Sequence, residues 1–322
     1  MHTLTLGDSL LQAESRLSEG PHPDRARKDA ENLLCHLLRK NRAWLLTHRD
    51  AGLDGPELEE FNQLVERRRA GEPVQYIAGE VEFYRMPFRV NRDVLIPRPE
   101  TEHVVECASQ LIPAFGQRSK GLFEFRRIHP ATHSEKQRER RGDPQQAGWP
   151  PRVLDVGAGS GCIAIGIAHD WSEAEITAID SSTSALEVAR FNAERLGFAG
   201  RIRFLEGDLL APVAGERFEI VVSNPPYVPE KDRGTLAVEV RDYEPQQALF
   251  AGEDGLAVYR RLIPEAFGAL VPGGFVVLEI GFGQRAAIRA LLAQSGFEEI
   301  GFTADLQGIP RVASARRPAA AG

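Results

Sequence analysis

Hydrophobic positions in the first 70 residues recur every three or four residues, which is the spacing of an amphipathic helix. Asp8 and Asp24 precede the first two of these patterns and are expected to cap the helices, whereas Pro56 opens the third. We predict a helical bundle over residues 1–73, serving as a packing appendage or as a domain that recognises a partner. Its apolar positions are Leu10, Ala13 and Leu17, then Ala26, Ala30, Leu33, Leu34 and Leu37, then Leu58, Phe61, Leu64 and Val65.

The pattern changes at Val74, where β-branched and aromatic residues become frequent. Residues 74–100 read VQYIAGEVEFYRMPFRVNRDVLIPRPE. Such runs, broken by turn-forming residues, are typical of strands. They predict a β-hairpin that links two domains.

Residues 113–150 have little apolar periodicity and are rich in Lys and Arg. This composition favours a flexible insertion with a solvated surface. A contact with nucleic acid or a ribosome is the alternative for so basic a segment.

Strands and helices alternate after residue 150. Short apolar runs begin near residues 152, 174, 201, 218 and 274, and most are separated by helical patterns. This alternation predicts an α/β fold in which helices cover both faces of a mostly parallel sheet. Ligands of such sheets bind at the carboxyl ends of the strands, so residues 101–322 are expected to form the catalytic domain.

Composition narrows the class of protein. No apolar run in the 322 residues approaches the length of about 18 needed to cross a membrane, and the first residues do not resemble a signal peptide, so we expect a cytoplasmic protein. The net charge of −7 disfavours a surface that tracks nucleic acid throughout. Cys35, Cys107 and Cys162 are widely separated among apolar residues and are expected to be buried rather than paired or bound to zinc.

A glycine-rich turn follows the first strand of the catalytic domain, in the segment DVGAGSG at residues 155–161. Glycines there let the backbone approach a ligand, although a tight turn alone would also use them. Asp180 ends the second strand, where a carboxylate can accept hydrogen bonds from both ribose hydroxyls. The spacing G-x-G-x-G, rather than G-x-G-x-x-G, favours a nucleoside without a pyrophosphate. The expected cofactor-binding residues here are Gly157, Ala158, Gly159, Ser160, Gly161 and Asp180.

Asp208 and Leu209 follow the third strand. The acid can accept a hydrogen bond from the amine of a base, and the leucine can pack on its face. Asp208 is equally well suited to capping a loop. Both residues are assigned to the cofactor site with this alternative open.

The segment NPPY, residues 224–227, ends the fourth strand. Pro225 and Pro226 have no N–H, and their fixed φ angles hold carbonyl groups outward. Asn224 and the Pro225 carbonyl can then accept the two N–H bonds of a planar amino group, on which Tyr227 can pack. We expect Asn224, Pro225 and Tyr227 to be catalytic, all four residues to bind substrate, and Asn224 to contact the cofactor as well. No metal is required, and a rigid strand exit is the structural alternative.

Two further charged features are less specific. Arg98, Glu100 and Thr101 lie in RPETE between the hairpin and a helix, where they form either an ordinary helix start or a wall over the cofactor pocket. Glu279 interrupts an apolar strand and needs a partner if it is buried, but its partner is not identifiable from the sequence.

Six segments occur in the order of one enzyme family: GEPVQYIAGEVEFYRMPFRV, VLIPRPETEHVVE, VLDVGAGSGCIAI, VVSNPPYVP, YEPQQALFAGEDGLAVYRRL and LEIGFGQ. The chain resembles the PrmC/HemK family of S-adenosylmethionine-dependent glutamine N5-methyltransferases, except in the insertion. The resemblance implies a helical substrate-recognition domain, a hairpin linker and a seven-stranded Rossmann-like class I methyltransferase domain whose last strand is antiparallel. It also implies methyl transfer to the glutamine of a Gly-Gly-Gln motif in peptide chain release factors, by a protein expected to be monomeric.

Two other functions compete with this hypothesis. Adenine N6 presents the same planar amino group to NPPY, so an amino-methyltransferase acting on nucleic acid is the second candidate. A non-catalytic binding module is the third, although Asn224 and the glycines that such a module could lose are all present.

Overall fold

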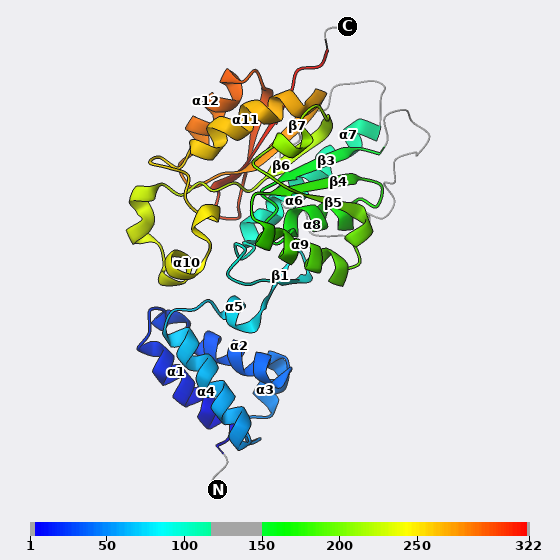
Figure 1. Cartoon of the computed structure of the whole chain (residues 1–322). Helices are drawn as coiled ribbons and strands as arrows, with labels where there is room; N and C mark the ends of the chain where they lie inside the picture. Colours follow the sequence, from blue (N-terminus) through cyan, green and yellow to red (C-terminus); the bar gives the residue numbers. More distant parts are fainter. Residues whose placement is uncertain (1–3, 117–149, 321–322) are drawn as a thin grey trace. The chain divides into compact units, whose positions relative to one another are not determined.

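The computed structural model describes residues 4–116 and 150–320 (Figure 1). The insertion at 113–150 lies outside the described residues, apart from α7 (Pro113–Gly116) and Pro150. The chain divides into two compact units. The first combines Met1–Val81, Arg89–Ile96 and Asp232–Gln246, and the second combines Glu82–Phe88, Pro97–Lys231 and Gln247–Gly322.

The first unit is built on helices that pack through their apolar faces, as the periodicity predicts. The expected caps were wrong in two places. The hydroxyl of Thr5 caps α1 by accepting the backbone N–H of Asp8, and α2 begins after a 3-10 turn that contains Asp24. The helices are α1 (Leu6–Ser18), α2 (Ala26–Leu38), α3 (Arg42–Thr47), α4 (Gly55–Arg69), α5 (Val74–Ala78) and α10 (Val238–Tyr243).

A buried polar cluster joins α10 to the other helices of the first unit. Arg68 of α4 is 2% exposed, and its guanidinium lies 2.7 Å from an Asp29 oxygen of α2 and 2.9 Å from a Glu239 oxygen of α10. Arg25 binds the other Glu239 oxygen at 2.7 Å. Since a buried charge is stable only when it is paired, these contacts fix α10 within this unit, although its residues come from a distant part of the sequence.

The predicted hairpin is present but shorter than its sequence pattern. Strands β1 (Glu80–Phe83) and β2 (Met86–Arg89) form a two-stranded sheet, and residues 74–78 are helical. Tyr84 and Arg85 connect the strands with φ angles of 52° and 61°. Two consecutive positive φ angles are the geometry of a tight type I′ turn, which matches the twist of the paired strands.

The second unit contains a seven-stranded sheet of order β5-β4-β3-β6-β7-β9-β8. The five strands from β5 to β7 are parallel, and β9 is antiparallel to both of its neighbours. The five strands expected from apolar runs are confirmed, and so are the antiparallel last strand and the α/β class implied by the resemblance. The strands are β3 (Arg152–Val156), β4 (Glu175–Asp180), β5 (Ile202–Glu206), β6 (Phe218–Ser223), β7 (Leu270–Glu279), β8 (Glu298–Ala304) and β9 (Pro310–Arg316).

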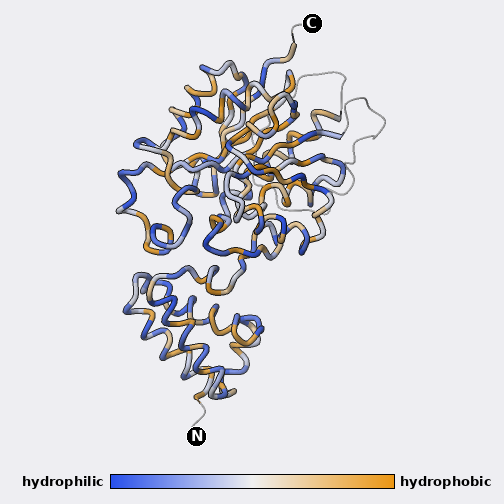
Figure 2. Tube along the Cα trace, viewed as in Figure 1, coloured by the Kyte–Doolittle hydropathy of each residue, from blue (hydrophilic) through white to orange (hydrophobic). Residues whose placement is uncertain are grey.

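Helices cover both faces of this sheet (Figure 1). Leu154, Val221 and Val276 share a core with α11 (Ala257–Ala269) and α12 (Arg285–Gln294). The other face carries α6 (Glu102–Leu111), α8 (Cys162–Asp170) and α9 (Thr183–Arg195). The central strands are therefore apolar along almost their whole length, as Figure 2 shows.

The structure bears on the expected burial of the cysteines and on the expected lack of a membrane-spanning segment. Cys107 and Cys162 are buried, and Cys35 is partly buried. None of the helices formed by the described residues is long and apolar enough to cross a membrane.

Candidate active site

The glycine turn and NPPY follow adjacent parallel strands. β3 lies between β4 and β6, so the carboxyl ends of these three strands share one edge of the sheet. The Ser223 hydroxyl at the end of β6 donates to the Val156 carbonyl at the end of β3, at 2.6 Å. The two motifs that the sequence separates by more than 60 residues are thereby brought together.

The glycine turn leaves space that a side chain would fill. Gly157, Gly159 and Gly161 have φ angles of 79°, 53° and 80°, which other residues adopt at a cost. Among the described residues, a Cβ atom added to Gly157 or Gly159 would meet no atom within 4 Å apart from those of its chain neighbours, whereas one on Gly161 would lie 3.2 Å from the Ala189 Cβ. Packing and the positive φ together favour glycine at position 161, whereas the first two glycines leave room for a ligand.

Ala158 and Ser160, the other two residues of the turn, stabilise its position through backbone hydrogen bonds. Ala158 is 5% exposed and Ser160 is 2% exposed. The Ala158 amide donates to the Ile179 carbonyl at 2.9 Å, and the Ser160 carbonyl accepts from the Asn192 side chain at 2.9 Å. These bonds hold the turn against β4 and α9.

Asp180 is fixed at the end of β4 with both carboxylate oxygens engaged. One oxygen accepts the Gly159 amide at 2.8 Å, and the other accepts the Ser182 amide at 2.9 Å. A carboxylate oxygen can accept more than one hydrogen bond, so each retains capacity for a ligand hydroxyl. Asp180 therefore couples the shape of the glycine turn to the place expected for a ribose.

Asp155 belongs to the same region and was missed by the sequence analysis. It is fully buried in β3, and burial raises the pKa of its carboxyl group to about 7. Its Oδ2 accepts the Ala164 amide at 3.1 Å, while its Oδ1 has no partner among the described residues. An acid inside an apolar strand directly before a glycine turn was the signal available in the sequence.

Asp208 and Leu209 follow β5 as expected, but their environments differ. The Asp208 side chain is 64% exposed and lies 2.5 Å from the Arg261 guanidinium of α11. An ion pair this exposed contributes little to stability. Leu209 is partly buried against the core on the α11 face and has a positive φ of 47°. Their contact with a base stays a prediction.

A chain of hydrogen bonds connects Asn224 of NPPY to Glu279 of β7. The Asn224 Nδ2 lies 3.1 Å from the Thr101 Oγ1, and this hydroxyl donates to the Glu279 Oε2 at 2.6 Å. Thr101 ends the 3-10 turn Pro99–Thr101 in the RPETE segment and is 2% exposed. The unassigned glutamate of the sequence analysis thus has its partner in RPETE.

The same glutamate also holds the last residue of NPPY. The Tyr227 hydroxyl lies 3.3 Å from the Glu279 Oε1, and the Tyr259 hydroxyl donates to the Glu279 backbone carbonyl at 2.6 Å. Gln284 Nε2 donates to the Tyr227 carbonyl at 3.0 Å. Burial raises the pKa of Tyr227 above its ordinary value, so this side chain acts as a hydrogen-bond donor. NPPY is therefore fixed at both ends.

Glu279 is 2% exposed, and burial raises the pKa of its carboxyl group to about 7. Its bonds to Thr101 and Tyr227 favour the ionised form and partly oppose that effect. Burial thus shifts the protonation of this carboxyl group toward neutral pH.

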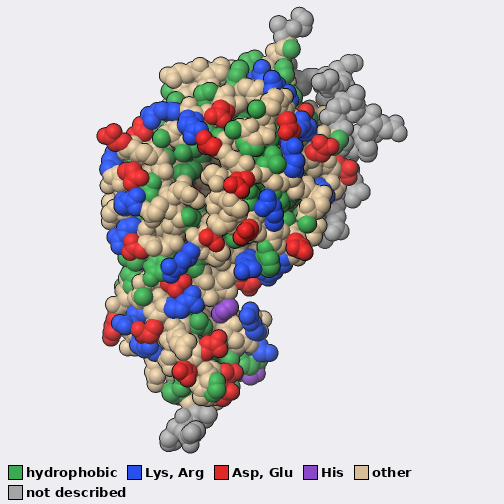
Figure 3. Space-filling view, viewed as in Figure 1, with side chains coloured by type: hydrophobic (Ala, Val, Ile, Leu, Met, Phe, Trp, Pro, Cys, Tyr) green, Lys and Arg blue, Asp and Glu red, His purple; other side chains and the backbone are tan. Residues whose placement is uncertain are grey.

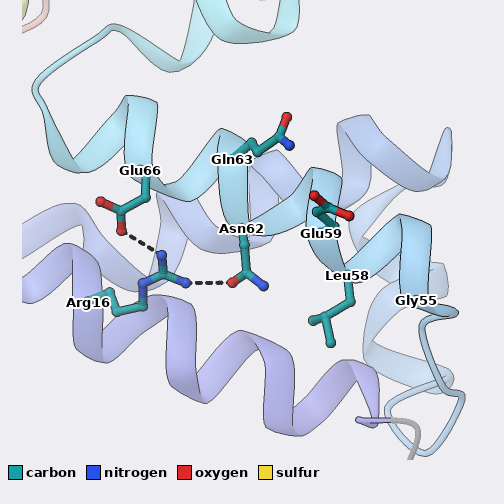
Figure 4. A pocket seen from close by; sticks show the side chains of 7 residues that line it. All are labelled: Arg16, Gly55, Leu58, Glu59, Asn62, Gln63 and Glu66. Carbon is teal, nitrogen blue, oxygen red and sulfur yellow. Dashed lines mark hydrogen bonds and ion pairs between the residues drawn. The ribbon is translucent and has the colours of Figure 1, made fainter.

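A second candidate site is a groove in the first unit, which is lined mainly by polar and charged side chains (Figure 4). Arg16 of α1 points toward α4, where it binds the Asn62 Oδ1 and the Glu66 Oε1, each at 2.5 Å. The groove is lined by Arg16, Gly55, Leu58, Glu59, Asn62, Gln63 and Glu66. The guanidinium of Arg16 is already bound to Asn62 and Glu66. The motifs expected to bind cofactor and substrate lie instead at the strand ends of the second unit, where we place the reaction.

The strand order with the antiparallel β9, the glycine turn and Asp180 at the end of β4 are the features expected for the fold of class I methyltransferases. Family models match in two places, the PrmC N-terminal domain at residues 8–79 and the methyltransferase small domain at residues 146–241. A release factor glutamine methyltransferase of Koribacter versatilis is 35% identical over 98% of this chain and 99% of its own length. The chain belongs to the family of release factor glutamine methyltransferases.

A second relative agrees with this assignment, and a solved structure supports the fold. A release factor glutamine methyltransferase of Bordetella pertussis is 38% identical, covering 90% of this chain and 94% of its own. The solved structure of the hMettl16 catalytic domain in complex with MAT2A 3'UTR hairpin 6 has a TM-score of 0.51 at 13% identity, covering 81% of this chain and 82% of that chain. At this identity the likeness supports the fold alone.

Proposed function

We propose that the chain transfers a methyl group from S-adenosylmethionine to the side-chain amide nitrogen of the glutamine in the Gly-Gly-Gln motif of peptide chain release factors. The observation that carries the proposal is the fixed position of NPPY beside the glycine turn, with Asn224 bonded through its Nδ2. That bond leaves the Asn224 Oδ1 as an acceptor. Family membership supports the choice of glutamine over other planar amino groups.

The reaction requires orientation rather than a strong base. The lone pair of an amide nitrogen is delocalised into its carbonyl group, so it attacks only when its π face points toward the methyl donor. If Asn224 Oδ1 accepts one N–H and the Pro225 carbonyl accepts the other, the nitrogen is held in that orientation. As the new N–C bond forms, the bond between the methyl group and the sulfonium breaks and would leave a neutral thioether. Both acceptors stabilise the positive charge that develops on the nitrogen until one of its N–H protons is lost to solvent.

Pro226 and Tyr227 complete the proposed substrate site. Pro226 has no N–H that could compete for the carbonyl acceptors, and its ring restricts the backbone after Pro225. The ring of Tyr227 can pack on the planar amide of the substrate, and its hydroxyl is held by Glu279. The substrate amide would thus meet a rigid surface.

The strand ends of β3 and β4 fit the cofactor, whose sulfonium supplies the methyl group. The space beside Gly157 and Gly159 accommodates a ligand close to the backbone, and Asp180 is placed for ribose hydroxyls. The proposed binding residues are Gly157, Ala158, Gly159, Ser160, Gly161, Asp180, Asp208, Leu209 and Asn224.

We expect Asp180→Ala to weaken cofactor binding by about 10- to 150-fold, because a charged hydrogen-bonding group contributes roughly 1.5–3 kcal/mol. Titration calorimetry with S-adenosylmethionine measures this change. Asp242→Ala is the matched control, since its carboxylate is exposed, pairs with Arg241 and lies outside the proposed cofactor site. Equal affinity of Asp180→Ala and the parent would exclude the ribose role.

The first unit is proposed to recognise the release factor, which the match to the PrmC N-terminal domain supports. Release factors act on cytoplasmic ribosomes, so we place the protein in the cytoplasm and propose that it works as a monomer.

The proposed function predicts that intact release factor incubated with the protein and methyl-labelled S-adenosylmethionine gains one methyl group on the Gly-Gly-Gln peptide. Mass spectrometry of the digested factor locates the group. A factor whose glutamine is replaced by alanine is the control. No incorporation into the intact factor would refute the proposal.

The same assay with DNA and RNA tests the amino-methyltransferase alternative. On the face drawn in Figure 3, Lys and Arg side chains are interspersed with Asp and Glu rather than gathered in one basic area. Since nucleic-acid binding depends mainly on clustered positive charge, we expect no labelled nucleic acid.

A further inference from the structure

We propose that Thr101 and Glu279 are positioning residues that orient the side-chain amide of Asn224, so that its oxygen rather than its nitrogen faces the substrate. The inference rests on the proposed role of Asn224 as an acceptor for the substrate amide. It assigns a function to the RPETE threonine and to the glutamate of LEIG, which otherwise have only structural contacts.

The direction of the hydrogen bonds follows from counting protons. An ionised carboxylate only accepts hydrogen bonds, so the Thr101 hydroxyl must give its single proton to the Glu279 Oε2 at 2.6 Å. The Thr101 oxygen can then only accept, and the group 3.1 Å away on Asn224 must be its Nδ2. Ionised Glu279 therefore fixes the amide with Oδ1 turned away from Thr101.

The arrangement is costly if it serves stability alone. Glu279 is 2% exposed, and among the described residues two hydroxyl groups, not a cation, bind its carboxylate. A buried charge without an opposite charge destabilises the folded state, and an apolar residue in this strand would avoid that cost. The benefit is that one carboxylate controls both ends of NPPY, through Thr101 at Asn224 and directly at Tyr227.

Protonation of Glu279 would reverse this chain of hydrogen bonds. A protonated carboxyl group can donate to Thr101, whose hydroxyl is then free to donate to Asn224 Oδ1. The amide would turn and present its NH2 group to a substrate that also offers N–H. The pKa of Glu279 is raised to about 7 by burial; Glu100 raises it further, Arg311 lowers it, and the hydroxyls of Tyr227 and Tyr259 face the same residue.

The first test compares Thr101→Val with Thr101→Ser in the full-length protein. Valine keeps the shape but removes the hydroxyl, and we expect kcat for release factor methylation to fall about 10- to 100-fold with cofactor affinity within threefold of the parent. Serine restores the hydroxyl, and we expect kcat to return to within threefold. Thermal unfolding of both variants confirms that they fold. Equal kcat values for Thr101→Val and Thr101→Ser would overturn the inference.

The second test is the pH dependence of kcat between about pH 5.5 and 8.5, a range that spans the raised pKa of Glu279, about 7. We expect the parent to lose activity below its midpoint as Glu279 gains a proton, and Glu279→Gln to lose that acid limb because glutamine does not titrate. An unchanged acid limb in Glu279→Gln would contradict the inference. A parent protein that methylates no release factor at any pH would instead refute the proposed function, so the two failures are distinguishable.

Discussion

Asn224→Ala is expected to lower kcat for release factor methylation by about 100- to 1,000-fold, the usual effect of removing one preorganised hydrogen-bonding group from an active site. The variant loses the acceptor that holds the substrate amide and stabilises its developing charge. Cofactor affinity should stay mostly intact, because Asp180 and the glycine turn are unchanged. Single-turnover transfer of labelled methyl measures the first effect, and titration calorimetry measures the second.

Asn41→Ala is the control for this variant. Asn41 caps α3 in the first unit, where its side chain accepts the Trp44 amide at 2.9 Å, and it is not among the residues proposed to contact the cofactor or the substrate amide. We expect normal kcat and a small loss of stability. Near-normal turnover of Asn224→Ala would show that the Pro225 carbonyl alone orients the substrate, and the assigned role of Asn224 would be wrong.

The sheet was predictable because its strands are buried on both faces. The runs that end at Val156 and Ser223 are mostly apolar, and the glycine turn marks where the first of them stops. Strand β8 gave no such signal, since most of its residues are only partly buried at the edge of the sheet. The antiparallel last strand was expected from family resemblance, and periodicity alone did not reveal it.

The predicted site residues lie at the ends of strands, where sequence motifs mark them. The residues that hold them in place, Thr101 and Glu279, are far apart in the sequence. Thr101 and Glu279 are 178 residues apart, and no pattern relates a threonine in a helix start to a glutamate in a strand. The sequence indicated only that Glu279 would need a partner. Identifying it required the topology, because β6 and β7 are neighbours and the turn before α6 reaches their carboxyl ends.

The membership of α10 was also hidden from the sequence. Residues Asp232–Gln246 lie between NPPY and α11, and a division of the chain at residue 100 places them in the catalytic domain. In the structure they belong to the first unit, because Glu239 binds the buried Arg68. An ion pair between two residues 171 positions apart produces no periodic pattern in the sequence. The division of the chain into domains at residues 73 and 100 therefore stays a prediction.

The role proposed for Glu279 has a consequence for stability that is independent of catalysis. Burial raises its pKa to about 7 from an ordinary value of 4.5, so the folded protein binds more protons than the unfolded chain between these values. The stabilising effect of the protonated form is complete below the unfolded pKa and is lost as pH rises through the folded pKa. Ionised Glu279 should therefore destabilise the folded protein at pH 8.

Glu279→Gln is thus expected to gain stability relative to the parent as pH rises. Between about pH 4.5 and 8 the difference in free energy of unfolding should shift in favour of the variant by about 3 kcal/mol, since each unit of pKa shift corresponds to roughly 1.4 kcal/mol. Denaturant unfolding at a series of pH values measures this difference. Comparing the two proteins cancels the similar contribution of Asp155, which is present in both.

Glu253→Gln, at an exposed position, controls for the change of residue type and should follow the parent at every pH. A constant difference between Glu279→Gln and the parent would mean that Glu279 has the same charge in the folded and unfolded states. The acid limb of the activity profile would then need another origin. The alternative result is a difference in free energy of unfolding that grows with pH, together with loss of the acid limb of kcat in Glu279→Gln. That result would show that the carboxylate that destabilises the fold is also the group that orients Asn224.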